Sequence, residues 1–137
     1  MTDTFLADHQ AIIRVTVEYC WALDEKDFDR LRSVFLPEAT ARLGSSSQDG
    51  IEEIIRRVST TLARFVGSQH MVSTHQIEID GDAAICRCYL HAQHVRPPGE
   101  EPPLLTVGGR YEDRFVRTPD GWRIAHRTLT SMWRAGE

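Results

Sequence analysis

A chain of 137 residues suits a single domain and is long enough to bury a core without disulfides or a structural metal. The net charge of −4 and the absence of a basic stripe argue against nucleic-acid binding. No apolar run reaches membrane-spanning length, and MTDTFLADHQ lacks a signal-peptide core. Three cysteines, Cys20, Cys86 and Cys88, fit free thiols. We therefore expect a cytoplasmic protein with no nucleic-acid or membrane partner.

The stretch YCWALDEKDFDRLRSVF, residues 19–35, ends one predicted helix and opens another. The first helix covers residues 4–22, where apolar side chains recur at three- and four-residue steps. Asp24 follows Cys20 by one helical turn, so its carboxylate points along a mostly apolar face, where an unpaired charge is costly. Either Asp24 lies at a fraying helix end in water or bonded to backbone amides, or another part of the chain supplies its partner.

Two more helices are predicted in the first half of the chain. One covers residues 27–35, with Asp27 as its N-cap, and ends before Pro37. Residues 39–43 suit a short strand, and the following SSSQDG suits a loop. The third helix begins at the capping-box pattern DGIE of residues 49–52 and ends at Gly67.

From residue 68 onward the pattern changes to strand-like alternation, punctuated by tight-turn signals at DG and TPDG. Helices first and strands later indicate an α+β fold. We expect a curved antiparallel sheet with three helices over its concave face, enclosing a pocket lined from both layers. The long strands are predicted at residues 70–79, 83–95, 104–117 and 122–133.

Strand alternation sorts the chemically active side chains of residues 83–95. Cys86, Cys88 and His94 share the apolar face, so His94 is expected to face the core or pocket, whereas His91 points outward. The pairs Cys86-x-Cys88 and His91-x-x-His94 suggest zinc, but alternation separates His91 from the others and the usual ligand spacings are absent. No metal site is therefore expected.

Alternation leaves two other residues open. His70 shares a face with Val72, but Ile77 takes the opposite parity, so a bulge is needed to reconcile them. On the last strand, strict alternation puts Arg127 on the less apolar side, where an outward salt bridge is the alternative to a role in the pocket. Gly108-Gly109 in mid-strand indicates a bulge or bend.

Taken together, these residues resemble the SnoaL-like branch of the NTF2-like superfamily of cone-shaped α+β barrels. The resemblance rests on Tyr19 five residues before Asp24, and on DFDRLRSVF, GIEEII, SQH at 68–70, GDAA, GRYEDRFVR and DGWRIAHR. Members similar in pattern are scytalone dehydratase, the hexachlorocyclohexane dehydrochlorinase and bile-acid 7α-dehydratase. The resemblance spans nearly the whole chain and implies one domain over residues 1–137.

The resemblance implies a His–Asp dyad of His70 and Asp24, with Tyr19 and Arg127 as further catalytic residues. It also implies a small hydrophobic substrate, no metal or organic cofactor, and a homodimer or homotrimer. Leu23 stands where scytalone dehydratase has a tyrosine, so scytalone itself is not the expected substrate. The expected substrate pocket includes His94, Trp21, Tyr111, Phe35 and Leu43.

Acid–base chemistry suits these residue types. A buried carboxylate that accepts the Nδ1 proton of an imidazole makes the ring a base, which could remove a proton from carbon beside a carbonyl. Tyr19 could stabilise the enolate, and Arg127 or His94 could assist the leaving group. This predicts a lyase or isomerase, dehydratase- or polyketide-cyclase-like, acting on a hydrophobic oxygenated cyclic molecule.

Two other functions stay open at this point. One is a non-catalytic binding or structural subunit of the same fold, like the small subunit of ring-hydroxylating dioxygenases. The other is epoxide hydrolysis in the manner of the limonene enzyme, which requires an Asp–Arg–Asp group. Asp113 and Arg127 could contribute to such a group, but the sequence offers no convincing second acid.

Overall fold

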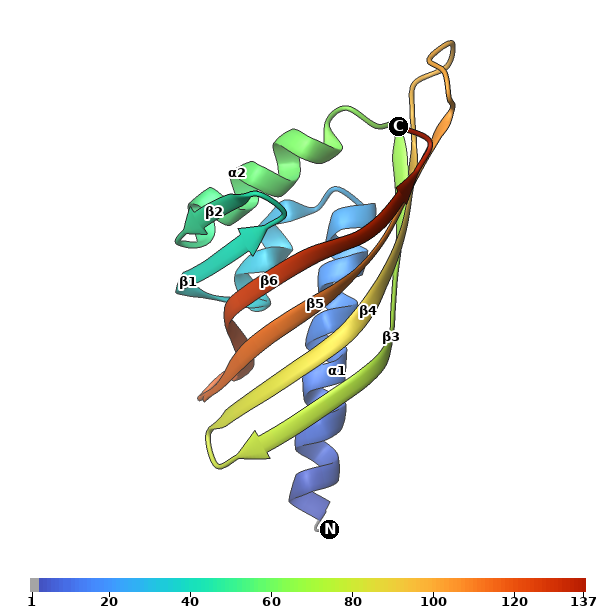
Figure 1. Ribbon diagram of the computed structural model, residues 1–137. Helices are drawn as coiled ribbons and strands as arrows, with labels where there is room; N and C mark the ends of the chain where they lie inside the picture. Colours follow the sequence, from blue (N-terminus) through green and yellow to red (C-terminus); the bar gives the residue numbers. More distant parts are fainter. Residues whose placement is uncertain (1–2) are drawn as a thin grey trace.

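The computed structural model describes residues 3–137, which form a six-stranded curved sheet with helices over one face (Figure 1). The α+β fold expected from the sequence is confirmed. The helices are α1 (Asp3–Asp24), a 3-10 helix (Phe28–Ser33) and α2 (Ile51–Leu62). The strands are β1 (Phe35–Leu43), β2 (Ser46–Asp49), β3 (Gly67–Asp80), β4 (Ala83–Val95), β5 (Leu104–Thr118) and β6 (Gly121–Ala135).

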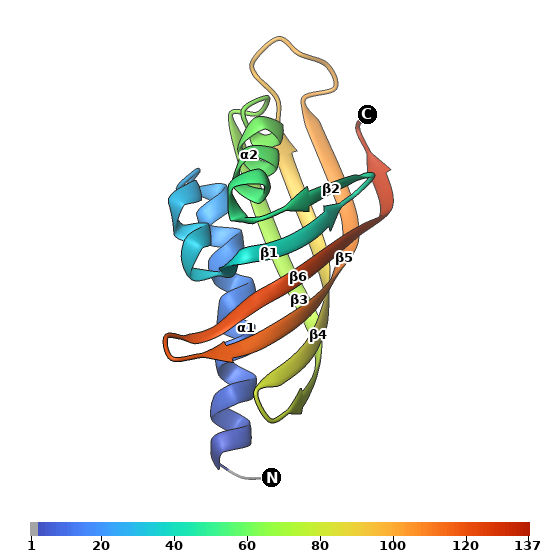
Figure 2. The ribbon, with the colours of Figure 1, turned by 90° about the vertical axis from the view of Figure 1, so that its left-hand side faces the viewer.

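The strand order in the sheet is β2-β1-β6-β5-β4-β3. Neighbouring strands are antiparallel except β1 and β6, which run parallel, so the sheet is mixed rather than purely antiparallel as expected. The sheet curves around α1, and α2 covers the end formed by β1 and β2 (Figure 2). No helix within residues 3–137 is long and apolar enough to cross a membrane.

The core lies between α1 and the concave face of the sheet. Ile12, Thr16, Tyr19 and Leu23 recur at helical spacing on α1, and all four are buried. From the sheet, the even-numbered residues of β4 from Ala84 to His94 supply an unbroken buried row. This confirms that His94 points inward and His91 outward, as strand alternation predicted.

The second predicted helix is wrong in type and length. Residues 27–35 contain only the short 3-10 helix, Asp27 makes no side-chain cap, and Phe35 already belongs to β1. The chain becomes extended ahead of Pro37, which disfavours helical geometry in its neighbour. The pairing of β1 with β6 is interrupted between Phe35 and Thr40, a stretch that contains Pro37, which has no N–H to donate.

Two predictions around the third helix also need correction. The predicted loop SSSQDG contains β2, which pairs with β1 as an edge strand. α2 has Gly50 as its N-cap with no side-chain cap bond, so the capping box is not formed as predicted. Instead the Glu53 carboxylate accepts a hydrogen bond from the Asp49 backbone N–H at 3.1 Å. α2 ends at Leu62 rather than at Gly67.

Bulges in β3 and β6 decide which side chains face the interior. In β3 the register with β4 shifts between Ser73 and Gln76, and Thr74 there has a φ of 61°. This bulge lets His70 and Ile77 both point inward, which strict alternation forbids. In β6 the register shifts at Ala125, and Arg127 consequently turns into the core, so the outward salt bridge considered for it is not formed.

A third irregularity lies where β5 passes Trp133 of β6. The β5–β6 register shifts between Gly108 and Gly109, but the extra residue is Met132 of β6, so the bulge lies opposite the two glycines and not in their own strand as expected. A Cβ at Gly108 would lie 2.0 Å from the Trp133 ring, so only glycine leaves room for the indole. His91 of β4 packs on the same indole, 5.5 Å between ring centroids.

Candidate functional site

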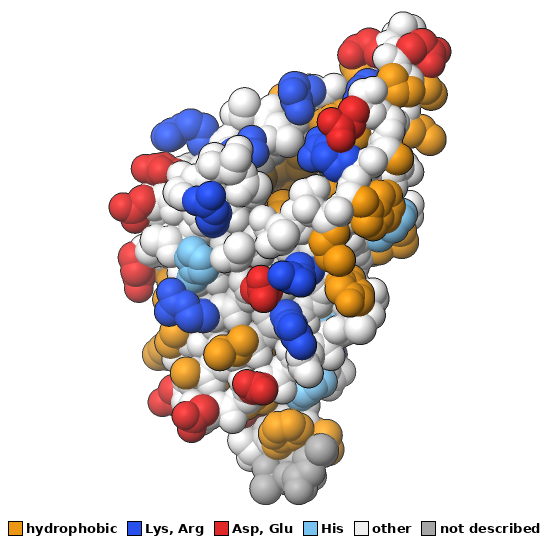
Figure 3. Space-filling view, viewed as in Figure 1, with side chains coloured by type: hydrophobic (Ala, Val, Ile, Leu, Met, Phe, Trp, Pro, Cys, Tyr) orange, Lys and Arg blue, Asp and Glu red, His pale blue; other side chains and the backbone are white. Residues whose placement is uncertain are grey.

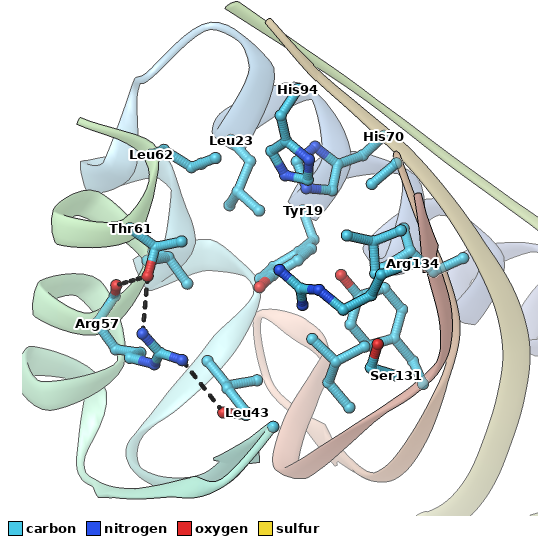
Figure 4. A pocket seen from close by; sticks show the side chains of 17 residues that line it. Tyr19, Leu23, Leu43, Arg57, Thr61, Leu62, His70, His94, Ser131 and Arg134 are labelled. Atoms are coloured by element: carbon cyan, nitrogen blue, oxygen red, sulfur yellow. Dashed lines mark hydrogen bonds between the residues drawn. The ribbon is translucent and has the colours of Figure 1, made fainter. Parts of the chain in front are cut away.

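A cavity of about 170 Å³ opens between the C-terminal end of α1, α2 and the sheet (Figure 4). Most of its surface is apolar, and none of the residues that line it is acidic. Its polar side chains come from every wall: Tyr19, Arg57, Thr61, His70, His94, Tyr111, Ser131 and Arg134. The apolar lining residues are Leu23, Leu43, Val58, Leu62, Leu90, Ala92, Val107 and Leu129.

The structure brings His70 of β3 and Asp24 of α1 together. His70 Nδ1 lies 2.6 Å from Asp24 Oδ1, and the His70 backbone N–H donates to Asp24 Oδ2 at 2.9 Å. Ser68 Oγ adds a third bond to the carboxylate, at 2.9 Å from Oδ1. The side chains are 6% and 17% exposed, respectively, so the contact is largely withdrawn from water. Asp24 is therefore neither fully solvated nor a helix cap: its partners come from β3.

These bonds keep Asp24 ionised and set the direction of its hydrogen bond with the His70 ring. Burial raises the pKa of Asp24, but hydrogen bonds from the His70 ring, the His70 backbone and Ser68 outweigh it and leave that pKa below its ordinary value. An ionised carboxylate only accepts hydrogen bonds, so His70 Nδ1 must donate. Asp24 is not among the residues that line the cavity, whereas His70 is. The Nε2 edge is therefore the part of the ring available to a bound molecule.

His94 lies beside the His70 ring, edge-on, with 5.6 Å between centroids. Its other face packs against Phe65, and its Nδ1 is 3.2 Å from the Leu105 carbonyl oxygen, to which it donates. Burial lowers the pKa of His94, so the ring is neutral at pH 7. The cavity thus contains two neighbouring imidazoles, of which only His70 is bonded to a carboxylate.

Tyr19 and Tyr111 form the wall behind the cavity, with ring centroids 5.7 Å apart. Arg127 of β6 lies against both rings, with its guanidinium 4.4 Å from the centroid of the Tyr19 ring and 3.8 Å from that of the Tyr111 ring. Arg127 donates two hydrogen bonds to Asp113, at 2.7 and 2.8 Å. Burial raises the pKa of both tyrosines, while the positive charge of Arg127 opposes that shift.

Arg127 itself is fully buried and does not line the cavity. Arg127 therefore cannot contact a leaving group in the cavity, as was expected of it. It can influence the cavity only through its contacts with Tyr19 and Tyr111. Asp113 is likewise walled off, which leaves the Asp–Arg pair considered for epoxide hydrolysis without access to a substrate.

Two of the expected pocket residues lie elsewhere. Trp21 is 57% exposed on the outer side of α1, because its helical position is opposite the buried stripe. Phe35 is buried behind Tyr19, edge-on at 5.9 Å, and does not reach the cavity. His94, Tyr111 and Leu43 do line it.

Sequence reasoning missed the polar residues near the mouth, chiefly Arg57 of α2 and Arg134 of β6. Arg57 falls on the helix of the GIEEII motif next to buried Val58, so helical periodicity could have drawn attention to it. Arg134 follows the second bulge of its strand, at Met132, and alternation could not have oriented it.

The cysteine-containing face of the sheet has no metal-binding arrangement. Within residues 3–137 there is no group of three or more His, Cys, Asp or Glu side chains that could hold a metal ion. Burial raises the pKa of Cys20 and Cys86 to about 12 and that of Cys88 to about 11, so all three are protonated thiols at neutral pH.

Known proteins are similar to this chain in sequence and in fold. The uncharacterized protein Rv2910c of Mycobacterium tuberculosis is 32% identical over 132 residues, covering 93% of this chain and 88% of that protein. A candidate scytalone dehydratase from Novosphingobium aromaticivorans superposes with a TM-score of 0.90 at 23% identity, covering 100% of this chain and 92% of that one. An NTF2-like superfamily protein from Salmonella enterica gives 0.84 at 21% identity and covers 96% of both chains.

The structural likeness at these identities concerns the fold alone: helices packed on a curved, unclosed sheet, as in the NTF2-like superfamily protein from Salmonella enterica. The family assignment has a separate basis in the sequence. The family model of the SnoaL-like domain matches residues 4–128, which include nearly all of α1, both dyad residues and Arg127. With nearly the whole described chain matched, this protein belongs to the SnoaL-like domain family.

Proposed function

We propose that this protein is a lyase or isomerase, dehydratase- or cyclase-like, in which His70 is the general base. The observation that carries the proposal is the 2.6 Å contact between His70 Nδ1 and an ionised Asp24 that lies outside the cavity. This contact holds the ring in one tautomer and leaves a basic nitrogen at the edge of an apolar cavity. Membership of the SnoaL-like family makes an enzymatic role plausible on independent grounds.

In the proposed reaction His70 Nε2 takes a proton from a carbon next to a carbonyl group, and the electron pair of that C–H bond forms an enolate. The Asp24 carboxylate stabilises the positive charge of the resulting imidazolium. For a substrate with a hydroxyl on the β carbon, the enolate collapses to a conjugated ketone as the C–O bond breaks. The proton on His70 leaves with the hydroxide as water, so the enzyme returns to its starting state.

The tyrosines have the second role in this proposal. Tyr19 and Tyr111 line the cavity and can donate hydrogen bonds to the enolate oxygen, while the adjacent Arg127 favours negative charge there. Arg127 then acts as a positioning residue, held by Asp113, rather than as a group that touches the substrate.

Cavity size supports a small cyclic substrate. An apolar cavity of about 150 Å³ is large enough for benzene. The cavity here, about 170 Å³ and mostly apolar, suits one six-membered ring with one or two oxygen substituents. We therefore propose a single-ring oxygenated substrate; the assembly of the chain as a homodimer or homotrimer stays a prediction.

The experiment that tests the proposal follows the dehydration of 3-hydroxycyclohexanone to the conjugated ketone by ultraviolet absorbance. We expect His70→Gln to lower kcat/KM by about 10²–10⁴-fold, the usual contribution of a positioned base. The matched control is His91→Gln, because His91 lies on the outer face of the sheet and is expected to leave the rate unchanged. If circular dichroism shows that both proteins are folded, equal dehydration rates for the wild type and His70→Gln would overturn the role of His70.

A further inference from the structure

Two arginines flank the cavity from opposite walls, Arg57 on α2 and Arg134 near the end of β6 (Figure 4). Figure 3 shows basic side chains on the surface between α2 and the end of the sheet, around a hollow in which hydrophobic side chains are visible. No acidic residue lines the cavity itself. The cavity therefore combines an apolar interior with a cationic mouth.

Arg57 donates hydrogen bonds to neutral oxygen atoms. Its Nη1 donates to Thr61 Oγ1 at 2.8 Å, and its Nη2 lies 3.5 Å from the Leu43 carbonyl oxygen. Both partners belong to the rim of the cavity, and they hold the guanidinium there without neutralising it. A guanidinium fixed in this way keeps donors free for a planar anion.

Arg134 has one acidic neighbour, Glu137, at 3.3 Å. The two side chains are 42% and 66% exposed, and exposed ion pairs of this kind contribute little to stability. In Figure 4 the Arg134 guanidinium extends from the sheet into the cavity, toward the side where α2 lies. An anion bound at the mouth can therefore replace Glu137 at small cost.

We propose that the substrate is an anion, a single-ring carboxylic acid whose carboxylate is bound by Arg57 and Arg134 while its ring occupies the apolar cavity beside His70. Guanidinium–carboxylate hydrogen bonds are charge-assisted and directional, so they fix how the ring is oriented. Such anchoring determines which ring carbon lies next to His70 Nε2 and thus which proton is removed. The inference rests on the proposed function, since it takes this cavity as the substrate site.

The test is a binding measurement that needs no turnover. Benzoate and benzamide have nearly the same shape, but only benzoate is charged at pH 7. We measure their dissociation constants by chemical-shift titration of the ¹⁵N-labelled wild-type chain. The expected result is that benzoate binds about tenfold more tightly than benzamide, a difference of about 1.4 kcal/mol, and that this preference shrinks in 1 M salt.

Variants locate the source of the preference. In Arg57→Gln/Arg134→Gln the ratio of the two dissociation constants is expected to fall to about one, while the affinity for benzamide stays within about twofold. The matched control is Arg56→Gln, which removes an exposed arginine from the same helix without touching the cavity, and it is expected to keep the wild-type ratio. All changed side chains are exposed, so folding is expected to be retained.

The result that overturns the inference is equal affinity of the wild type for benzoate and benzamide, or a preference that the double variant retains. This outcome is distinct from failure of the proposed function. A chain without the carboxylate preference that still loses turnover in His70→Gln has the proposed chemistry on a neutral substrate. A chain that binds benzoate through the arginines but turns over equally well without His70 has the proposed ligand class and a different chemistry.

Discussion

The interior of this protein contains two acid–base contacts of similar length, of which one borders the cavity and the other does not. His70 and Asp24 meet at 2.6 Å beside a cavity, whereas Arg127 and Asp113 meet at 2.7 Å with both side chains fully buried. In the first pair the His70 ring lines the cavity, and its Nε2 has no hydrogen-bond partner within residues 3–137. The second pair is enclosed by two tyrosine rings and the sheet.

The comparison teaches that a short ionic contact does not by itself indicate chemistry. What distinguishes the two pairs is which side chain reaches an open volume. The resemblance assigned catalytic roles to both His70 and Arg127, but only His70 lines the cavity. A buried ion pair that meets no substrate can still act by orienting the groups that do, here Tyr19 and Tyr111.

The largest effect is expected on removing one half of the buried pair. Asp113→Ala leaves the Arg127 guanidinium charged in an apolar environment, because burial of an unpaired ion is costly. We expect a loss of about 3–5 kcal/mol in the free energy of unfolding, measured by urea denaturation. The double variant Asp113→Leu/Arg127→Met removes both charges and should recover most of that loss. If the single and double variants had similar free energies of unfolding, Arg127 and Asp113 would not be buried as described.

An intermediate effect is expected for Asp24→Asn, which keeps the shape and removes the charge. Losing charged hydrogen bonds should lower the free energy of unfolding by about 1–3 kcal/mol at pH 7. The folded-state pKa of Asp24 lies below its unfolded value of 3.8, so this stabilisation is present above pH 3.8 and is lost as the pH falls through the folded value.

Chemical denaturation of wild type and Asp24→Asn at a series of pH values measures this dependence. The difference between the two proteins should be constant near neutrality and shrink in acid below pH 3.8. The turnover of Asp24→Asn should fall as well, by about 10²–10⁴-fold, because the His70 ring loses the partner that sets its tautomer. The matched control Asp29→Asn changes an exposed carboxylate near α1 and should alter neither quantity.

The smallest effect concerns His94, which is buried beside His70 but bonded to no carboxylate. Its folded-state pKa is lowered from 6.5, so the unfolded chain takes up protons first and stability falls as the pH drops below 6.5. His94→Gln should remove part of this slope, by less than about 1 kcal/mol between neutrality and mild acid. His75 and His126, whose pKa values are also lowered, contribute to the same slope. An unchanged slope in His94→Gln would show that His94 is not desolvated as described.

The sequence alone determined the first helix, the four long strands with their tight turns, and the inward direction of His94. These features depend on local patterns: periodicity on α1, two-residue alternation on β4, and glycine at the hairpin turns. The family resemblance added the pairing of His70 with Asp24, which are 46 positions apart. Local patterns failed for residues 27–35. They did not distinguish an α-helix from a short 3-10 helix that leads into a β-strand.

Only the tertiary structure decided which polar side chains share the cavity. The bulges in β3 and β6 reverse the parity of everything beyond them, and a bulge depends on how two strands pair rather than on the residues of one strand. The bulge in β3 brings His70 and Ile77 to the same face, and the one at Ala125 turns Arg127 from a surface position into a buried ion pair. Phe35 is excluded from the pocket for a related reason: it is buried behind Tyr19, and whether a buried side chain lines a cavity depends on the elements packed around it.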